Sequence, residues 1–252
     1  MSTGLTTSYS WPFSIYRGFW RAIDWIFPPT CAGCGAMGFR FCPNCEAQVV
    51  RLNQDRVCHC CGTPLLNSGN TYCSQCQNTP LALNGIRSWA IYQGPLRKAI
   101  QSLKYHRNLG LGDHFTPDLL HTFLPQHWNI DLIIPVPLSP ARQRQRGYNQ
   151  ASVLAAPLAL ALHKPLVSRG LKKCRETPSQ VGQSASERWK NVQGAFESDP
   201  RRVSGYNILL VDDVFTTGAT LNACAEALLD AGASAVYGLT LARAISHADD
   251  QL

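Results

Sequence analysis

Long apolar runs are absent from this chain. None of its 252 residues lies in an uninterrupted hydrophobic stretch of about 18, so we expect no membrane-spanning helix. Charged residues are also few, at 15% against 45% hydrophobic residues, and this composition excludes a disordered or fibrous protein. The aromatic stretch 11–27 is interrupted by Arg17, Arg21 and Asp24, and no small-residue cleavage site follows it. We therefore expect no signal peptide.

A loop of the form G-x-x-x-x-G-K-[ST] is missing too, which disfavours a Walker-type nucleotide site. Acidic residues are in the minority, with 16 against 23 Lys and Arg and a net charge of +7. This balance favours anionic partners, either phosphorylated small molecules or nucleic acid, and charge alone does not choose between them. The basic residues come in short groups, each of which a solvated surface would also explain: Arg142/Arg144/Arg146, Lys172/Lys173/Arg175 and Arg201/Arg202.

Composition divides the chain into unequal parts. We predict an aromatic leader at 1–27, a cysteine-rich module at 28–84, an α/β domain at 85–246 and a C-terminal tail at 247–252. A helical leader could lie on a membrane surface as an amphipathic helix or pack against the neighbouring module. We expect packing, through Phe19, Ile23, Ile26 and Phe27.

Nine of the eleven cysteines lie between Cys31 and Cys76. Eight of them form four C-x-x-C pairs: Cys31/Cys34, Cys42/Cys45, Cys58/Cys61 and Cys73/Cys76. Two such pairs supply the four sulfurs of a structural zinc site, and without an export signal we expect a reducing compartment in which disulfides are rare. We predict one or two Zn²⁺ ions. Sequential and interleaved pairing both remain open, and His59 and Cys60 are expected bystanders.

Zinc knuckles also occur in nucleic-acid-binding proteins. Here Arg40, Arg51 and Arg56 are the only Lys or Arg residues between Cys31 and Cys76, too few for a convincing electrostatic footprint. The module is therefore predicted to be structural.

The segment from residue 85 onward alternates strands with helices. Strands are predicted at 86–92, 131–136, 207–211 and 235–241, and helices from Pro95, at 113–123, 150–162 and 218–230. This alternation predicts a parallel sheet flanked by helices.

The segment 209–220, LLVDDVFTTGAT, is the most informative one in the chain. A buried strand delivers Asp212 and Asp213 to the carboxyl end of the sheet, where open α/β folds bind ligands. Carboxylates accept hydrogen bonds from vicinal hydroxyls, as in a ribose. The turn that follows enters a helix N-terminus, whose amides and dipole favour a phosphate. Paired acids that merely cap a turn are the structural alternative.

This segment resembles the phosphoribosyl-pyrophosphate motif of type I phosphoribosyltransferases. The resemblance implies that Asp212 and Asp213 hold the ribose hydroxyls. It also implies that the 5′-phosphate lies on Val214, Phe215, Thr216, Thr217, Gly218, Ala219 and Thr220. The implied fold class is the type I phosphoribosyltransferase fold, a parallel sheet flanked by helices, here with an N-terminal cysteine-rich zinc-binding module.

Over residues 26–243 the chain resembles the ComF/GntX competence-associated family. Four ordered blocks carry the resemblance: FPPTC-x-x-CG at 27–35, YQGPLRK-x-I-x-x-LKY at 92–105, PVPL with R-x-R-x-RGYNQA at 135–151, and RETPSQVGQS-x-x-ER-x-x-NV-x-GAF at 175–196. Gln183 departs from the apolar residue usual at that position, which puts the packing of its loop in doubt.

The resemblance to type I transferases also implies how pyrophosphate is bound. The loop Pro135, Val136, Pro137 and Leu138 would contact it, and a hood loop at 172–183 would bring Arg175 and Lys173. Lys104, Arg142 and Arg146 are further candidates for donor binding, with surface charge as their alternative. Asp212, Asp213 and Arg175 are the implied catalytic residues. Pyrophosphate would leave C1 of the ribose through an oxocarbenium-like state, with Mg²⁺ and cations offsetting its charge.

Family resemblance implies a phosphoribosyltransferase, a glycosyltransferase of pentosyl groups, that binds phosphoribosyl pyrophosphate. It implies a role in natural transformation and DNA uptake on the cytoplasmic side, with an unidentified acceptor. The alternative is a non-catalytic competence factor that binds phosphoribosyl pyrophosphate or single-stranded DNA. A third hypothesis is an adaptor of the uptake proteins at the inner membrane face, which would make the location peripheral to that membrane.

Overall fold

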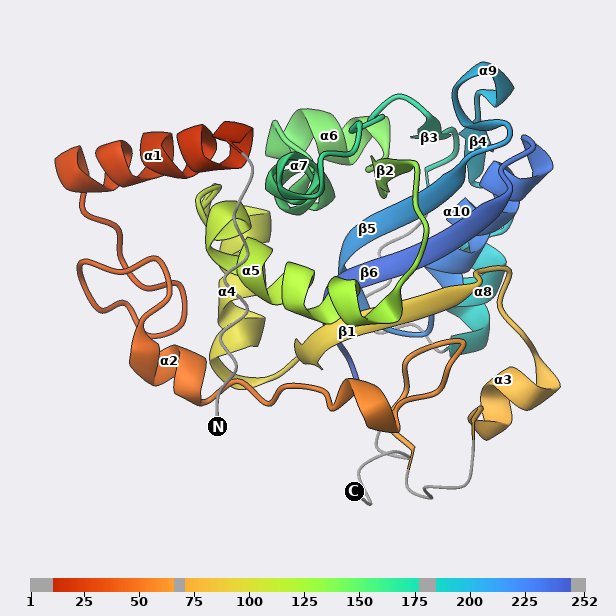
Figure 1. Ribbon diagram of the computed structural model, residues 1–252, viewed down its shortest axis with the longest axis horizontal. Helices are drawn as coiled ribbons and strands as arrows, with labels where there is room; N and C mark the ends of the chain where they lie inside the picture. The colour runs from red at the N-terminus through yellow and green to blue at the C-terminus, as the bar shows by residue number, and fades with distance from the viewer. Residues whose placement is uncertain (1–10, 66–70, 177–184, 246–252) are drawn as a thin grey trace.

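A four-stranded parallel sheet forms the centre of the computed structural model, which describes residues 11–65, 71–176 and 185–245 (Figure 1). The strands are β1 (Gly85–Ile91), β2 (Leu132–Pro135), β5 (Asn207–Phe215) and β6 (Ala235–Arg243). Their order across the sheet is β1-β6-β5-β2, and every neighbouring pair is parallel. The central strands β5 and β6 are consecutive and joined by a helix, whereas β1 and β2 pair with strands distant in sequence.

Helices cover both faces of the sheet (Figure 1). Along β5, Leu209 and Val211 face one core and Ile208 and Leu210 the other, because side chains alternate along a strand. The first core is closed by α4 (Gly94–Tyr105), α5 (Leu111–Phe123) and α7 (Gln150–Leu162). The second is closed by α8 (Ala185–Val192) and α10 (Ala219–Asp230). The predicted flanked parallel sheet is confirmed.

Two helices on one face, α5 and α7, approach closely at a glycine. Pro157 lies inside α7 and has no amide hydrogen, so the carbonyl of Val153 lacks its usual helical donor. Gly112 of α5 lies against that carbonyl, and a Cβ there would be 2.2 Å from the Val153 oxygen. Only glycine permits this distance.

Strand β5 is longer than predicted. Sequence placed its end at residue 211, with both acids after it, whereas β5 continues to Phe215. The reason is that β6 also continues, so that Asp212 pairs with Thr240 and Phe215 with Arg243. The shorter elements are η2 (Leu124–Gln126), α6 (Pro140–Arg146), α9 (Pro200–Val203) and an antiparallel pair, β3 (Leu171–Lys173) with β4 (Phe196–Ser198).

The cysteine-rich module runs along the β1 edge of the sheet and contains α2 (Pro43–Ala47), η1 (Gln54–Arg56) and α3 (Ser74–Asn78). Its middle pairs with β1 through the amide of Leu52, which donates to the Trp89 carbonyl over 2.9 Å. Two buried arginines of the sheet reach back: Arg87 Nη1 donates to the His59 carbonyl (3.1 Å), and Arg243 Nη1 to the Cys61 carbonyl (2.7 Å). The module is therefore anchored to the sheet by backbone and side chains alike.

The leader does not pack as predicted. It forms α1 (Trp11–Ile26), in which Phe13 is buried and Ile23 is partly buried, whereas Phe19, Ile26 and Phe27 are 58%, 63% and 72% exposed. The helix lies against α5 and α7. No helix among the described residues is long and apolar enough to span a membrane. The predicted part boundaries at 27, 84 and 246 stay predictions.

Candidate donor site and zinc clusters

The candidate site opens where β2 stops. Pro135, the last residue of β2, pairs with Val211, so the next four residues of β5 extend beyond the neighbouring strand. The loop after β2 diverges there, as ligand sites at the carboxyl ends of parallel strands require. A cavity of about 180 Å³ lies there, here called the donor cavity after the ligand predicted for it. Its described lining is Lys104, Val136, Pro137, Leu138, Ser139, Arg142, Gln150, Lys173, Phe196, Asp212, Asp213, Val214, Phe215, Thr216, Gly218, Thr220 and Leu221.

The two acids differ in their surroundings. Asp213 is 3% exposed, and its Oδ1 lies 2.8 Å from Nζ of Lys104. Its Oδ2 is buried with no hydrogen-bond partner among the described residues. Asp212 is only partly buried, and its Oδ1 accepts a hydrogen bond from the Asp213 amide over 2.8 Å. Buried polar atoms are nearly always paired, so an unpaired carboxylate oxygen on a residue that lines the cavity indicates a capacity to bind a hydroxyl or a cation.

Burial and neighbouring charges shift the pKa values of Asp212 and Lys104. Burial raises the pKa of Asp212 to about 7, the charge of Asp213 acts in the same direction, and Lys104 opposes both. Burial by itself lowers the pKa of Lys104, but the charge of Asp213 and its hydrogen bond outweigh burial and raise that pKa overall. Lys104 is therefore a fixed cation, and Asp212 changes its charge near neutral pH.

The threonine-rich turn leads directly into α10. Gly218 precedes the helix with φ of 82°, a left-handed conformation that favours glycine. A Cβ at this position would also lie 2.8 Å from the Phe215 ring, so glycine is required for a steric reason as well. Within the described chain, the amides of Thr216, Thr217 and Gly218 have no acceptor in the protein. Free amides at the positive end of a helix suit a phosphate group.

The structure gathers most, not all, of the predicted site residues. Pro135, Thr217 and Ala219 belong to the same strand end and turn but do not line the cavity. Arg175 lies elsewhere: its Nη2 donates to the carbonyls of Asn191 (3.2 Å) and Gln193 (2.7 Å). Lys173, two residues earlier, reaches the cavity instead. Most of the predicted hood loop, 177–184, lies outside the described residues.

A second hollow of about 850 Å³ adjoins the cavity and shares five lining residues with it: Lys104, Leu138, Arg142, Gln150 and Thr216. Its described lining carries five cations and no acid: Lys104, Arg107, Arg142, Arg146 and Arg188, with Tyr105, Leu138, Gln145, Tyr148, Gln150 and Thr216. Arg146 therefore lies here and not in the donor cavity. Some lining residues were not assigned to the site, although the blocks that carry the family resemblance, at 92–105, 135–151 and 175–196, contain them: Tyr105, Ser139, Gln145, Tyr148, Gln150, Arg188 and Phe196. Arg107 and Leu221 lie outside these blocks, and no sequence signal pointed to them.

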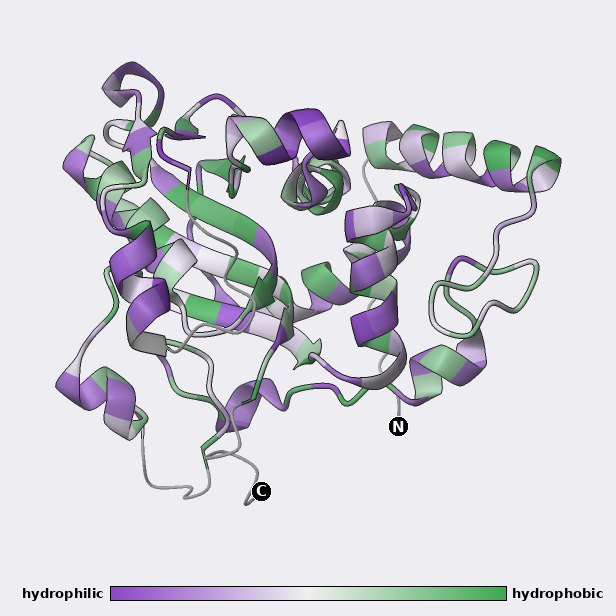
Figure 2. Ribbon diagram, turned by 180° about the vertical axis from the view of Figure 1, so that it is seen from behind, coloured by the Kyte–Doolittle hydropathy of each residue, from purple (hydrophilic) through white to green (hydrophobic). Residues whose placement is uncertain are grey.

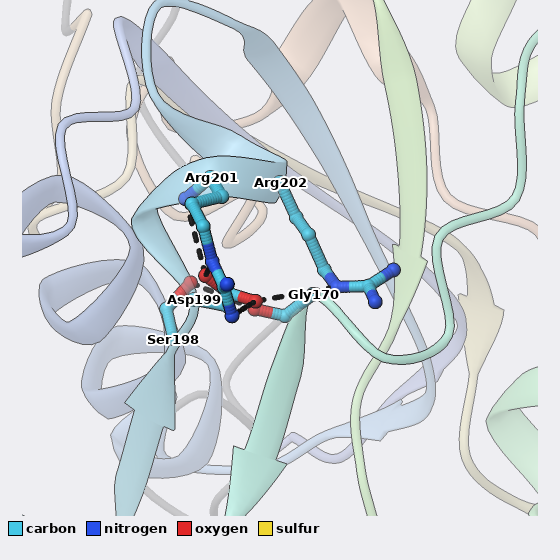
Figure 3. Close-up of polar contacts among 5 residues, drawn as sticks. All are labelled: Gly170, Ser198, Asp199, Arg201 and Arg202. Atoms are coloured by element: carbon cyan, nitrogen blue, oxygen red, sulfur yellow. Dashed lines mark hydrogen bonds and ion pairs between the residues drawn. The ribbon is translucent and has the colours of Figure 1, made fainter.

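The basic group Arg201/Arg202 has a local role (Figure 3). Asp199 accepts from the Arg201 amide at the start of α9 (3.2 Å), and its carboxylate lies 3.1 Å and 3.4 Å from Nε of Arg201 and Arg202. Ser198 donates to the Gly170 carbonyl over 2.7 Å and so ties β4 to the chain just before β3. These arginines pair with Asp199.

The cysteine sulfurs form two separate clusters, Cys31/Cys34/Cys42/Cys45 and Cys58/Cys61/Cys73/Cys76, each with all sulfurs within 4.8 Å of one another. Pairing is therefore sequential, which resolves the alternative left open by sequence. The sulfurs of Cys34 and Cys42 are 3.6 Å apart, and those of Cys31 and Cys45, and of Cys61 and Cys73, are 3.7 Å apart. Four sulfurs around one Zn²⁺ ion, at Zn–S bonds of about 2.3 Å, would be about 3.8 Å from one another, so these distances suit a tetrahedral zinc site. His59 and Cys60 stay outside both clusters.

Comparison with known proteins agrees with both parts of the structure. A double zinc ribbon domain model matches residues 22–77, and a phosphoribosyl transferase domain model matches residues 149–251. The DNA utilization protein YhgH of Escherichia coli (strain K12) is 32% identical over 194 residues, which are 75% of this chain and 85% of that protein. The chain belongs to the ComF/GntX family.

Other ComF/GntX relatives align over most of their length. Competence protein F of Haemophilus influenzae is 31% identical over 216 residues (81% of this chain, 90% of that protein), and Competence protein ComFC of Bacillus subtilis is 28% identical over 232 residues (89% of each). Among solved structures, an adenine phosphoribosyltransferase is 19% identical over 59% of this chain and 76% of its own, with a TM-score of 0.36. The fold assignment rests on the domain models and the strand order, not on this weak likeness.

The ion pair at the base of the donor cavity permits a stability test of this ComF/GntX site. Lys104→Met leaves the almost fully buried Asp213 carboxylate without its cation, so we expect the free energy of unfolding to fall by about 2 kcal/mol. Urea unfolding measures the change. Lys98→Met, at an exposed position of the same helix, is the control and should change stability little. Equal effects of the two substitutions would show that the ion pair is not stabilising.

Proposed function

We propose that this protein binds phosphoribosyl pyrophosphate with Mg²⁺ and transfers the phosphoribosyl group to an acceptor, acting in DNA uptake or utilization on the cytoplasmic side. The observation that carries the proposal is the buried, unpaired Oδ2 of Asp213, a residue that lines the cavity together with Asp212 and the threonine-rich turn. Adjacent acids suit the two ribose hydroxyls, and the turn suits the 5′-phosphate.

The lysines and arginines of the two hollows would bind the pyrophosphate leaving group. Lys104, Arg142 and Lys173 line the donor cavity with the loop 136–138, and Arg146 extends the positive surface into the adjoining hollow. They would offset the charge that develops on pyrophosphate as the bond to C1 breaks. Oxygen ligands such as those of Asp212 and Asp213 are what Mg²⁺ prefers, and when bound it would supply further charge neutralisation. Arg175 would need to leave its present carbonyl partners to join them.

Pyrophosphate release tests turnover. Purified protein with phosphoribosyl pyrophosphate, Mg²⁺ and either cell extract or DNA components should release pyrophosphate, and Asp212→Asn/Asp213→Asn should release none above background. Binding without release, across metals and acceptors, would favour the non-catalytic alternative. Absence of binding altogether would contradict the proposal.

The raised pKa of Asp212 predicts a pH dependence. Below about pH 7 the group carries a proton, and above it the carboxylate accepts hydrogen bonds from ribose hydroxyls. Affinity for phosphoribosyl pyrophosphate is thus expected to increase as pH rises through this value. Calorimetry across the range measures the increase, and Asp212→Asn separates it from the titration of the ligand's own phosphate. An equal increase in that variant would assign the effect to the ligand.

A second candidate function is single-stranded DNA binding, favoured by the adjoining hollow with its five cations and two tyrosines. Cations bind phosphates and aromatic rings stack with bases. We expect Arg142→Glu/Arg144→Glu/Arg146→Glu to weaken binding of an oligonucleotide at least about tenfold and to reduce its salt dependence. Fluorescence anisotropy measures both. Arg169→Glu/Arg201→Glu/Arg202→Glu, in the hollow of about 460 Å³ around Asp199, is the charge-matched control.

A further inference from the structure

Helix α1 presents an apolar face to solvent. At 100° per residue, the positions of Trp11, Ile15, Phe19, Trp25 and Ile26 fall within an arc of about 120°. These five side chains, here called the apolar strip, are 74%, 63%, 58%, 88% and 63% exposed, in that order. Gly18 and Ala22, also exposed, complete the arc, which contains no charged residue. Contiguous exposed apolar surface of this kind marks a contact site.

Contacts on the opposite side of α1 fix this orientation. Phe13 is fully buried, Arg40 pairs with Asp24 (Nε to Oδ2, 2.9 Å), and the Arg40 guanidinium lies 4.7 Å from the Trp20 ring centre. Arg17 lies 3.8 Å from Asp113 of α5. A surface helix usually turns its apolar side inward, whereas α1 turns Arg17 and Asp24 toward the rest of the protein and the apolar strip outward. The strip is therefore held outward by specific contacts with the rest of the protein.

We propose that the apolar strip of α1 docks the protein on the surface of an anionic phospholipid bilayer. The strip has a tryptophan near each end, and tryptophan concentrates at membrane–water interfaces. A helix of 16 residues is about 24 Å long, enough to lie flat in the interface, and α1 lies at the outer edge of the molecule (Figures 1 and 2).

Charge decides for an anionic surface. Of the charged residues of α1, all of which the structure describes, Asp24 is neutralised by Arg40 and Arg17 faces Asp113. Arg21 is exposed at the border of the strip, so the border is cationic, on a chain of net charge +7. Anionic lipid headgroups attract such a border while the acyl region takes up the aromatic side chains.

Vesicle flotation tests the proposal. The full chain should float with phosphatidylcholine vesicles that contain phosphatidylglycerol, and less with phosphatidylcholine alone. Ile15→Asp/Phe19→Asp should weaken vesicle binding at least about tenfold, since two charges would enter the lipid interface. Leu124→Asp/Tyr206→Asp introduces the same two charges at large exposed side chains away from α1 (44% and 46% exposed) and should float like wild type. Circular dichroism and zinc content would verify folding of each variant.

A second measurement needs no variant. Lipids brominated on their acyl chains should quench the tryptophan fluorescence of the wild-type chain, because Trp11 and Trp25 enter the bilayer. Failure to float, equal flotation of the strip variant, or absence of quenching would overturn the proposal. So would a lipid-free dimer that Ile15→Asp/Phe19→Asp dissociates, since a second copy would then cover the strip. Flotation that appears only after removal of residues 1–10 would likewise assign the strip to that segment.

Discussion

Asp212→Asn/Asp213→Asn should weaken binding of phosphoribosyl pyrophosphate and Mg²⁺ at least about a hundredfold, a loss of about 2.7 kcal/mol or more. The amide side chains keep the shape of the site but remove both negative charges. Asp213 Oδ2 has no partner among the described residues, and Lys104, which pairs with Oδ1, would become an uncompensated cation in the cavity. Hydrogen bonds to charged groups are about twice as strong as neutral ones, so both substitutions act in the same direction.

Isothermal calorimetry measures this loss directly. The matched control is Asp55→Asn/Asp230→Asn, which removes two exposed carboxylates away from the cavity and changes the net charge equally. It should bind like wild type. If the control lost as much affinity as the site variant, overall charge would explain the result. If the site variant bound normally, these acids would not hold the ribose, and the proposed function would fail with them.

Loss of zinc from the second cluster, Cys58/Cys61/Cys73/Cys76, should strongly reduce the stability of the protein. Cys58→Ser/Cys61→Ser removes two of the four sulfurs of one cluster, so the purified chain should carry one zinc ion where wild type carries two. Structural zinc contributes on the order of 10 kcal/mol to the folding of isolated zinc modules, and we expect a loss of several kcal/mol here. Zinc quantification and thermal unfolding measure the two results.

The damage should extend to the donor site. Arg243 donates to the Cys61 carbonyl and lies 4.3 Å from the ring centre of Phe215, the ring against which Gly218 packs. Unfolding of the second ribbon releases Arg243 and with it the support of the phosphate turn, so affinity for phosphoribosyl pyrophosphate should also fall. Cys60→Ser/Cys174→Ser, outside both clusters, is the control. Full zinc content or unchanged stability in Cys58→Ser/Cys61→Ser would show that the cluster does not bind a structural ion.

Much of the architecture could be read from the sequence because it depends on local spacing. Helix α7 begins and ends at the predicted residues, since apolar periodicity and the Asn149 cap are both local signals. The cysteine pairs were recognisable because a C-x-x-C turn brings two sulfurs together by itself. The acid pair and the glycine before α10 were recognisable because strand, turn and helix follow one another directly.

Other features were decided only by tertiary structure, because they depend on which surfaces meet. Three features depend on neighbours distant in sequence: the sequential pairing of the cysteines, the length of β5 beside β6, and the unpaired Asp213 oxygen next to the end of β2. Arg175 was assigned to the site by its position in a motif, yet its side chain found backbone carbonyls at the end of α8. The same holds for α1: its amphipathic pattern was visible in the sequence, but ion pairs to Arg40 and Asp113 determined that its apolar side faces outward.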